Sequence, residues 1–187
     1  MRPQKLSREQ ILNACALQFK RYGYAGTSME MLAKACGLTK ASFYYYYPSK
    51  EALLLDVLEL TQHYLNSHLF KLNENTQISA AEYFDQMHTR AVQFFSYEVK
   101  GCLVGMLSLE ARYHSADLLD KIRAIFQHWE MAFYQLFRLQ LQEDEAKILA
   151  KQSVADYEGA ILMYRLNDDL FYLDQVKQRI LKQLTAA

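Results

Sequence analysis

The side chains best suited to phosphate binding lie close together between residues 40 and 50. Lys40, Ser42 and the run Tyr44 to Tyr47 are followed by Lys50. A lysine is a point charge suited to phosphate, and a tyrosine hydroxyl can donate to a phosphate oxygen while its ring contacts a sugar or a thymine methyl group. Core packing at helical spacing cannot bury four consecutive tyrosines. The cluster therefore indicates a surface that contacts a polyanion.

Charge is distributed unevenly along a chain whose formal net charge is zero. Residues 1–50 contain eight Lys or Arg and two acids, a net of +6, whereas residues 51–187 contain thirteen and nineteen, a net of −6. Basic charge concentrates near polyphosphate and releases counterions on binding, and an acidic remainder helps to orient the encounter. A solvated basic face would have the same composition, so charge alone does not establish DNA binding.

Three short helices are expected to position the tyrosine cluster. Ser7 and Gln10 form a capping box that begins a helix over 8–22, which Gly23 ends. A second box, Thr27-Ser28-Met29-Glu30, begins a helix that ends at Gly37, and a third helix runs from Thr39 or Lys40 to Pro48. Three helices in this order are typical of a helix-turn-helix.

The residues at the turn fit that interpretation. Ala33 is small where two helices would cross, Gly37 supplies the positive φ of the turn, and Leu38 would fill the core. Phe43 and Tyr47, four residues apart, are predicted to face inward. The side chains left on the accessible faces are Lys40, Ala41, Ser42, Tyr44, Tyr45 and Tyr46.

The rest of the chain also shows helical periodicity, and its few Gly and Pro residues favour an all-α fold of about nine helices. A loop is predicted over 71–77. We expect a helix-turn-helix DNA-binding domain over 1–48 and a helical regulatory and dimerisation domain over 49–187. The further helices are expected from about Ser49 past Leu65, from Ser79 to about Tyr97, after Gly105 to about His114, from Ser115 toward Gln142, and over about 144–165 and 170–184.

The segment Thr27-Ser28-Met29-Glu30-Met31-Leu32-Ala33-Lys34-Ala35-Cys36-Gly37-Leu38-Thr39-Lys40-Ala41-Ser42-Phe43-Tyr44-Tyr45-Tyr46-Tyr47-Pro48-Ser49-Lys50-Glu51-Ala52-Leu53 closely resembles the DNA-binding domain of the tetracycline-repressor (TetR) family. The match spans about residues 8–55. The resemblance implies that Ser42 and Tyr44 approach bases or phosphates of the DNA and that Tyr45 and Tyr46 contact the DNA backbone. It also implies phosphate contacts from the amides near Ser28 and Met29 and from Lys50.

The polar N-terminus does not resemble a secretory signal and no apolar run is long enough to span a membrane, so a cytoplasmic protein is expected. The resemblance further implies a transcriptional regulator, most often a repressor, that binds a palindromic DNA operator as a homodimer and is released by a small-molecule effector. Its last two helices would form a dimeric four-helix bundle, with Gly159 permitting close approach. Packing inside one chain is the alternative for each residue of this interface. The expected interface residues are Ile148, Ala155, Tyr157, Ala160, Ile161, Tyr164, Val176, Ile180, Leu181 and Leu184.

Aromatic and methionine side chains between these regions suit a pocket for an apolar or aromatic ligand with a few polar anchors. For any single member, core packing is the favoured explanation. The predicted ligand-binding residues are Met87, Phe94, Met106, Tyr113, Phe126, Trp129 and Phe133.

Three cysteines, Cys15, Cys36 and Cys102, lie far apart in sequence and predict neither a disulfide framework nor a zinc site. Gly101-Cys102-Leu103 resembles a segment of electrophile-responsive members of the same family. A thiol at a helix N-terminus favours its thiolate, so an alternative function is a redox or electrophile switch through Cys102. A small buried residue that fills a helix crossing is the structural alternative.

Other functional classes find little support in the sequence. An enzyme would need a nucleophile and base or a carboxylate–histidine metal cluster, and neither the Glu59–His63 nor the Glu110–His114 spacing has further ligands, so no enzyme, metal or cofactor is expected. No apolar run approaches the roughly 18 residues of a membrane span. A helical interaction adaptor would not need the basic N-terminus or the exposed tyrosines.

Overall fold

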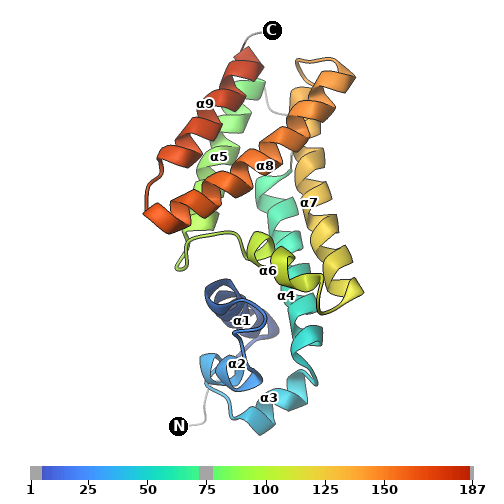
Figure 1. Cartoon of the computed structure of the whole chain (residues 1–187), viewed down its shortest axis with the longest axis vertical. Helices are drawn as coiled ribbons and strands as arrows, with labels where there is room; N and C mark the ends of the chain where they lie inside the picture. Colours follow the sequence, from blue (N-terminus) through green and yellow to red (C-terminus); the bar gives the residue numbers. More distant parts are fainter. Residues whose placement is uncertain (1–5, 72–77, 186–187) are drawn as a thin grey trace. The chain divides into compact units, whose positions relative to one another are not determined.

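The computed structural model of the chain describes residues 6–71 and 78–185, and nearly all of them lie in helices (Figure 1). Six of the predicted loop residues, 72–77, lie outside the described residues. Over the described ranges the elements are α1 Arg8–Tyr22, α2 Met29–Ala35, α3 Lys40–Tyr46, α4 Lys50–Tyr64, a π-helical turn η1 Leu65–Leu69, α5 Ala80–Ser96, α6 Leu103–Ala111, α7 Ala116–Phe137, α8 Glu143–Asn167 and α9 Phe171–Thr185. The predicted all-α class is confirmed.

Local capping explains where several helices begin. Ser7 accepts from the backbone N–H of Gln10 and receives the Gln10 side chain on its own N–H, and Ser79 and Glu82 form the same reciprocal box at α5. Each box satisfies two amides that the first helical turn leaves without partners. The box at Ser7 was predicted from sequence and is confirmed, and α5 begins directly after Ser79, where a helix was predicted to start.

The second predicted box is placed one residue too early. Ser28, not Thr27, caps α2, and its Oγ accepts from the N–H of Met31 at 3.2 Å. Thr27 is buried, and its hydroxyl donates to the carbonyl oxygen of Gly23 at 2.6 Å. Thr27 therefore stabilises the turn between α1 and α2 instead of beginning the helix.

The chain forms two compact units. The first contains the residues up to His63 together with Leu103–Arg123, and the second contains Tyr64–Cys102 and Ala124 onward. The first unit thus includes α1 to α4, α6 and the start of α7, although α4, α6 and α7 lie within the predicted regulatory domain of 49–187. In the second unit α9 packs against both α5 and α8.

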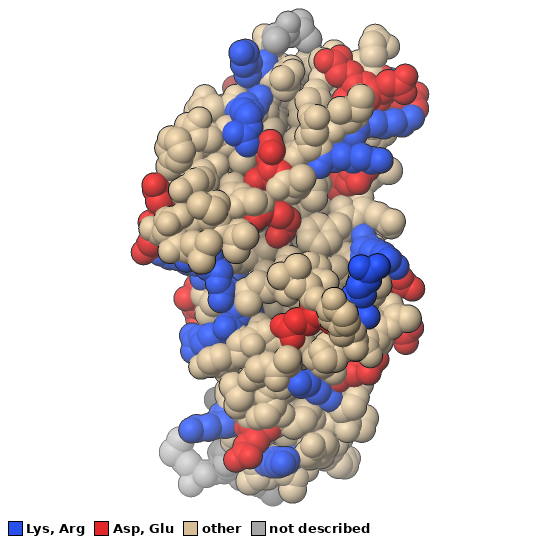
Figure 2. Space-filling view, in the orientation of Figure 1, with Lys and Arg blue, Asp and Glu red and all other residues tan. Residues whose placement is uncertain are grey.

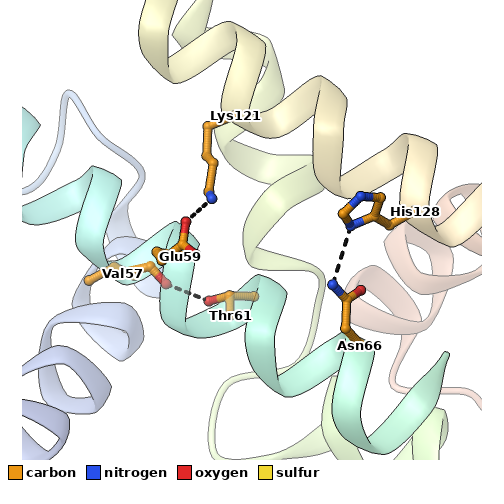
Figure 3. Close-up of polar contacts among 6 residues, drawn as sticks. All are labelled: Val57, Glu59, Thr61, Asn66, Lys121 and His128. Atoms are coloured by element: carbon orange, nitrogen blue, oxygen red, sulfur yellow. Dashed lines mark hydrogen bonds and ion pairs between the residues drawn. The ribbon is translucent and has the colours of Figure 1, made fainter. Parts of the chain in front are cut away.

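Polar contacts link helices within each unit. In the first unit, Lys121 of α7 forms an ion pair with Glu59 of α4 (Figure 3). Within α4 itself, the Thr61 hydroxyl donates to the Val57 carbonyl at 2.8 Å. In the second unit, Asn66 Nδ2 lies 3.3 Å from His128 Nδ1. On the face drawn in Figure 2, acidic and basic side chains are scattered among a majority of uncharged residues.

Candidate DNA-binding surface and regulatory core

Helix α3 has one buried side and one accessible side. Its N-cap is Thr39, whose hydroxyl accepts from the Ser42 N–H at 3.2 Å. Phe43 is completely buried and Tyr47 is 8% exposed, with their ring centroids 6.2 Å apart. The predicted inward orientation of both residues is confirmed.

The accessible side of α3 is formed by the residues predicted for it. Tyr44 is 44% exposed, Tyr45 is 88% exposed and Tyr46 is 38% exposed. The remaining members, Lys40, Ala41 and Ser42, are also exposed. Hydroxyl, ammonium and aromatic groups are therefore available together on a helix only seven residues long.

The turn before α3 has the geometry that a helix-turn-helix requires. Gly37 has a φ of +63°, a left-handed conformation that glycine adopts without a side-chain clash. Ala33 is buried where α2 meets its neighbours, and Leu38 is half-buried. At the start of α2, Ser28 is exposed and Met29 is half-buried.

Lys50 has contacts that its predicted role did not include. Its ammonium group donates to the carbonyl oxygens of Tyr24 at 2.6 Å and Thr27 at 2.8 Å, and lies 4.1 Å from the centroid of the Tyr24 ring. Burial lowers the pKa of Lys50, whereas the nearby Glu110 carboxylate raises it. Lys50 thus fastens the α1–α2 loop to the start of α4, and its phosphate contact stays a prediction.

Glu110 of α6 holds the same loop from another side. Its carboxylate accepts from the backbone N–H of Tyr24 at 3.1 Å and of Ala25 at 2.6 Å. A Cβ atom at Gly23, whose φ is +72°, would collide with this carboxylate. The loop that precedes α2 is therefore attached to α6 by two charge-assisted hydrogen bonds.

The two Glu–His spacings considered as metal ligands have other partners. Glu110 binds backbone amides, and the ring of His114 lies 4.6 Å from that of Tyr24. Glu59 pairs with Lys121. Within the part of the chain that the structure describes, no group of three or more His, Cys, Asp or Glu side chains could hold a metal ion.

The second unit contains an aromatic cluster centred on Trp129. Phe126 and Phe133, both predicted ligand residues, each have ring centroids 6.4 Å from that of Trp129. Met87 is buried, and Phe94 stacks on Tyr64 at 5.2 Å. The rings of Phe70, Phe95 and Tyr157 also lie 6.0, 5.8 and 5.7 Å from that of Trp129. The Phe84 ring lies 6.4 Å from that of Phe133.

Two of the predicted ligand residues belong to the first unit. Met106 is half-buried on α6, and Tyr113 is 83% exposed in the turn after α6. The predicted set is therefore divided between the two units, and the second unit holds five of its seven members.

A buried polar pair lies within the aromatic cluster. His88 Nδ1 is 2.6 Å from the Tyr157 hydroxyl, and both side chains are buried. Burial lowers the pKa of His88 to about 4 and raises the pKa of Tyr157. His88 is therefore neutral near pH 7. Tyr157 was predicted to lie at the dimer interface, and that prediction is wrong because the residue is buried inside one chain. Helical periodicity marks an apolar face but not which neighbour covers it.

Two of the three cysteines lie in contact. Cys15 of α1 and Cys36, the C-cap of α2, have their Sγ atoms 3.8 Å apart in the core of the first unit. Cys102, in the second unit, directly precedes α6, is buried and has a hydrogen bond to Glu158. The contact between Cys15 and Cys36 could not be predicted from residues separated by 21 positions.

A helix-turn-helix with an exposed aromatic and basic recognition helix defines the chain as a DNA-binding protein. Residues 11–57 match the bacterial regulatory proteins of the tetR family, and residues 77–179 match the C-terminal domain of LmrA/YxaF-like transcriptional regulators. The chain belongs to the TetR family. It is a transcriptional regulator, not an enzyme.

Named relatives match over most of their length. The uncharacterized HTH-type transcriptional regulator YxaF of Bacillus subtilis is 30% identical over 87% of both chains, and LmrA of the same organism is 28% identical over 84% of this chain and 85% of its own. The repressor DhaR of a Mycobacterium species is 24% identical over 90% of this chain and 87% of its own. A TetR regulator from Legionella pneumophila has the same fold, with a TM-score of 0.89, 22% identity and coverage of 97% of this chain and 100% of its own.

Along the described residues, no helix is long and apolar enough to cross a bilayer.

Proposed function

We propose that the chain is a cytoplasmic homodimeric repressor that binds a palindromic DNA operator and releases it when a small apolar or aromatic molecule binds the regulatory core. The observation that carries this proposal is the pair of hydrogen bonds from Tyr24 and Ala25 to Glu110. Cys102 belongs to the second unit, and α6 begins at the next residue. A change of the second unit on ligand binding would therefore shift α6 and, with it, the loop before α2. The name of the relative DhaR supports repression.

The operator contacts proposed are those that the accessible side of α3 supports. Tyr44 and Ser42 approach bases or phosphates, and Tyr45 and Tyr46 contact the backbone. Each of these side chains is exposed and presents a hydroxyl group. The other proposed contacts are Lys40 and Ala41 on the same helix, the α2 N-terminus at Ser28 and Met29, and Lys50.

The dimer interface proposed is an apolar stripe along α8. Ile148, Leu162 and Leu166 are 58%, 56% and 68% exposed, and Ala155 and Gly159 lie at helical spacing between them. A Cβ atom at Gly159 would meet nothing within 4 Å, so the fold of one chain does not require glycine here. A second α8 helix could approach closely at this position.

Most of the residues predicted for the interface lie instead inside the chain. They are buried because α8 and α9 pack against each other and α9 packs against α5. Leu181 is half-buried. The seven buried residues are Tyr157, Ala160, Ile161, Tyr164, Val176, Ile180 and Leu184.

The second unit has features that suit an effector with both rings and polar groups. The Trp129 cluster supplies aromatic surface next to the His88–Tyr157 pair. Among the described residues, Arg90 Nε and Glu158 Oε1 are buried without a hydrogen-bond partner. Buried polar atoms of this kind are usually satisfied, so both are candidate anchors for a ligand.

The thiol switch through Cys102 is the second candidate. Its support is the position of Cys102 directly before α6, the helix that holds the α1–α2 loop. The thiol is buried and hydrogen-bonded to Glu158, and a buried thiol is reached by reagents less readily than an exposed one. We therefore favour the small-molecule effector.

Selection from fragmented genomic DNA tests the proposal. The full chain should enrich a palindromic duplex and bind it as a dimer or pair of dimers, with an affinity that falls steeply as salt is raised. Failure to enrich any duplex would refute it. On the selected duplex, release by a maleimide from wild type but not from Cys102→Ser would favour the thiol switch, and equal behaviour of both would favour the bound effector.

A further inference from the structure

Cys15 and Cys36 form a buried pair of thiols that the proposed repressor mechanism does not use. Their Sγ atoms are 3.8 Å apart, and the side chains are 0% and 5% exposed. A disulfide bond is about 2.05 Å long, so the sulfurs need to approach by less than about 2 Å. Side-chain rotation with a small helix shift can supply that movement.

We propose that Cys15 and Cys36 are a modification site: hydroperoxides convert them to a reversible intrachain disulfide that loosens the grip of the recognition helix on DNA. The site lies within the DNA-binding helices themselves. It is therefore independent of the effector and of Cys102.

The surroundings assign a role to each thiol. The two thiols share a hydrogen bond in which either sulfur can be the donor. With Cys15 as the donor, this bond lowers the pKa of Cys36 despite the opposing effect of burial and raises the pKa of Cys15. Cys36 is thus the thiol that more readily forms the nucleophilic thiolate. Cys15 is the resolving thiol.

The chemistry balances with one hydroperoxide for each disulfide. The Cys36 thiolate attacks the hydroperoxide and the O–O bond breaks. The products are Cys36 sulfenic acid and, after protonation, an alcohol, or water when the oxidant is hydrogen peroxide. Cys15 then attacks the Cys36 sulfur and displaces hydroxide, which takes the Cys15 proton and leaves as water. Two thiols lose two electrons, and the hydroperoxide gains them. A small dithiol reverses the reaction by thiol–disulfide exchange.

Burial and position determine how the bond would act. Because both thiols are buried, oxidation requires transient opening between α1 and α2, so it should be slower than oxidation of an exposed thiol. Cys36 directly precedes Gly37, and the turn at Gly37 leads to Thr39, the N-cap of α3. Drawing Cys36 toward α1 therefore displaces the start of α3.

Peptide mapping of the oxidised full chain tests the bond directly. Trypsin places the three cysteines in separate peptides, 9–20 with Cys15, 35–40 with Cys36 and 101–112 with Cys102. After hydrogen peroxide treatment without denaturant and alkylation of the remaining thiols, we expect peptides 9–20 and 35–40 to be joined, and a dithiol to separate them. A link that forms only in denaturant, only between chains or only with Cys102 would overturn the proposal.

Operator affinity tests the consequence. On a duplex that the protein selects from a random pool, peroxide should cause a loss of binding that a dithiol restores. Cys15→Ala and Cys36→Ala should each abolish this loss, whereas Cys102→Ala should keep it. A disulfide that leaves affinity unchanged would overturn the regulatory part. If the chain selects no duplex, the proposed repressor function fails, while the peptide map still decides whether the disulfide forms. If an alanine variant does not fold, the peptide map of the wild-type chain still shows whether the disulfide forms.

Discussion

Neighbouring substitutions in α3 should separate folding from DNA binding. Phe43 is completely buried, so Phe43→Ala removes a full core ring and should lower the free energy of unfolding by roughly 3–5 kcal/mol. Tyr44 is 44% exposed and loses much less buried surface. Alanine is also the better helix former by about half a kcal/mol, so Tyr44→Ala should change stability by less than about 1 kcal/mol.

The effects on operator binding should have the opposite order. Loss of a base contact costs about 1–3 kcal/mol, so Tyr44→Ala should raise the Kd for the selected duplex by roughly five- to 150-fold. Urea denaturation monitored by circular dichroism gives the free energy of unfolding. Fluorescence anisotropy with a labelled duplex gives the Kd. Tyr113→Ala is the matched control, because Tyr113 is 83% exposed in the same unit but lies outside α3. It should change neither quantity.

Two results would refute the assignment of faces on α3. One is equal destabilisation by Phe43→Ala and Tyr44→Ala, which would mean that both rings support the core. The other is an unchanged Kd for Tyr44→Ala, which would remove Tyr44 from the contact surface.

Three further perturbations test the other contacts. Glu110→Gln should lower the free energy of unfolding of the first unit by about 1.5–3 kcal/mol in urea denaturation, because a hydrogen bond to a charged group contributes about that much. The control Glu59→Gln alters an exposed ion pair and should cost less than about 1 kcal/mol. Equal losses would contradict the role of Glu110. Leu162→Glu should convert the dimer to a monomer in analytical ultracentrifugation. The control Leu139→Glu, at a similarly exposed leucine outside α8, should leave the dimer intact. A dimer that survives Leu162→Glu would place the interface elsewhere. His88 has a pKa near 4 in the folded chain and 6.5 when free, so stability that depends on the neutral imidazole is complete above about pH 6.5 and is lost as pH falls toward 4, by up to about 3 kcal/mol. His88→Gln should therefore flatten the plot of unfolding free energy against pH between about pH 4 and 6.5. An unchanged plot would show that another group titrates there.

Helix boundaries and the two sides of α3 could be predicted because local interactions set them. The Ser7 and Ser79 caps bond to amides three residues away, and the positive φ of Gly37 belongs to one residue. The inward spacing of Phe43 and Tyr47 follows from the period of a single helix. Even here, burial of Thr27 by its tertiary neighbours moved the α2 cap to Ser28.

The contacts that suggest regulation were decided by the tertiary structure. Glu110 meets the amide of Tyr24 across 86 positions of the chain, and Cys15 meets Cys36 across 21. Periodicity marks the apolar faces of a helix but not which neighbour covers each face, so Tyr157 was assigned to a partner chain although it lies in the core beside His88. The sequence by itself determined the helices and the recognition surface, because those depend on residues a few positions apart. The loop attachment, the thiol pair and the free face of α8 depend on how distant helices pack, and only the folded chain contains that information.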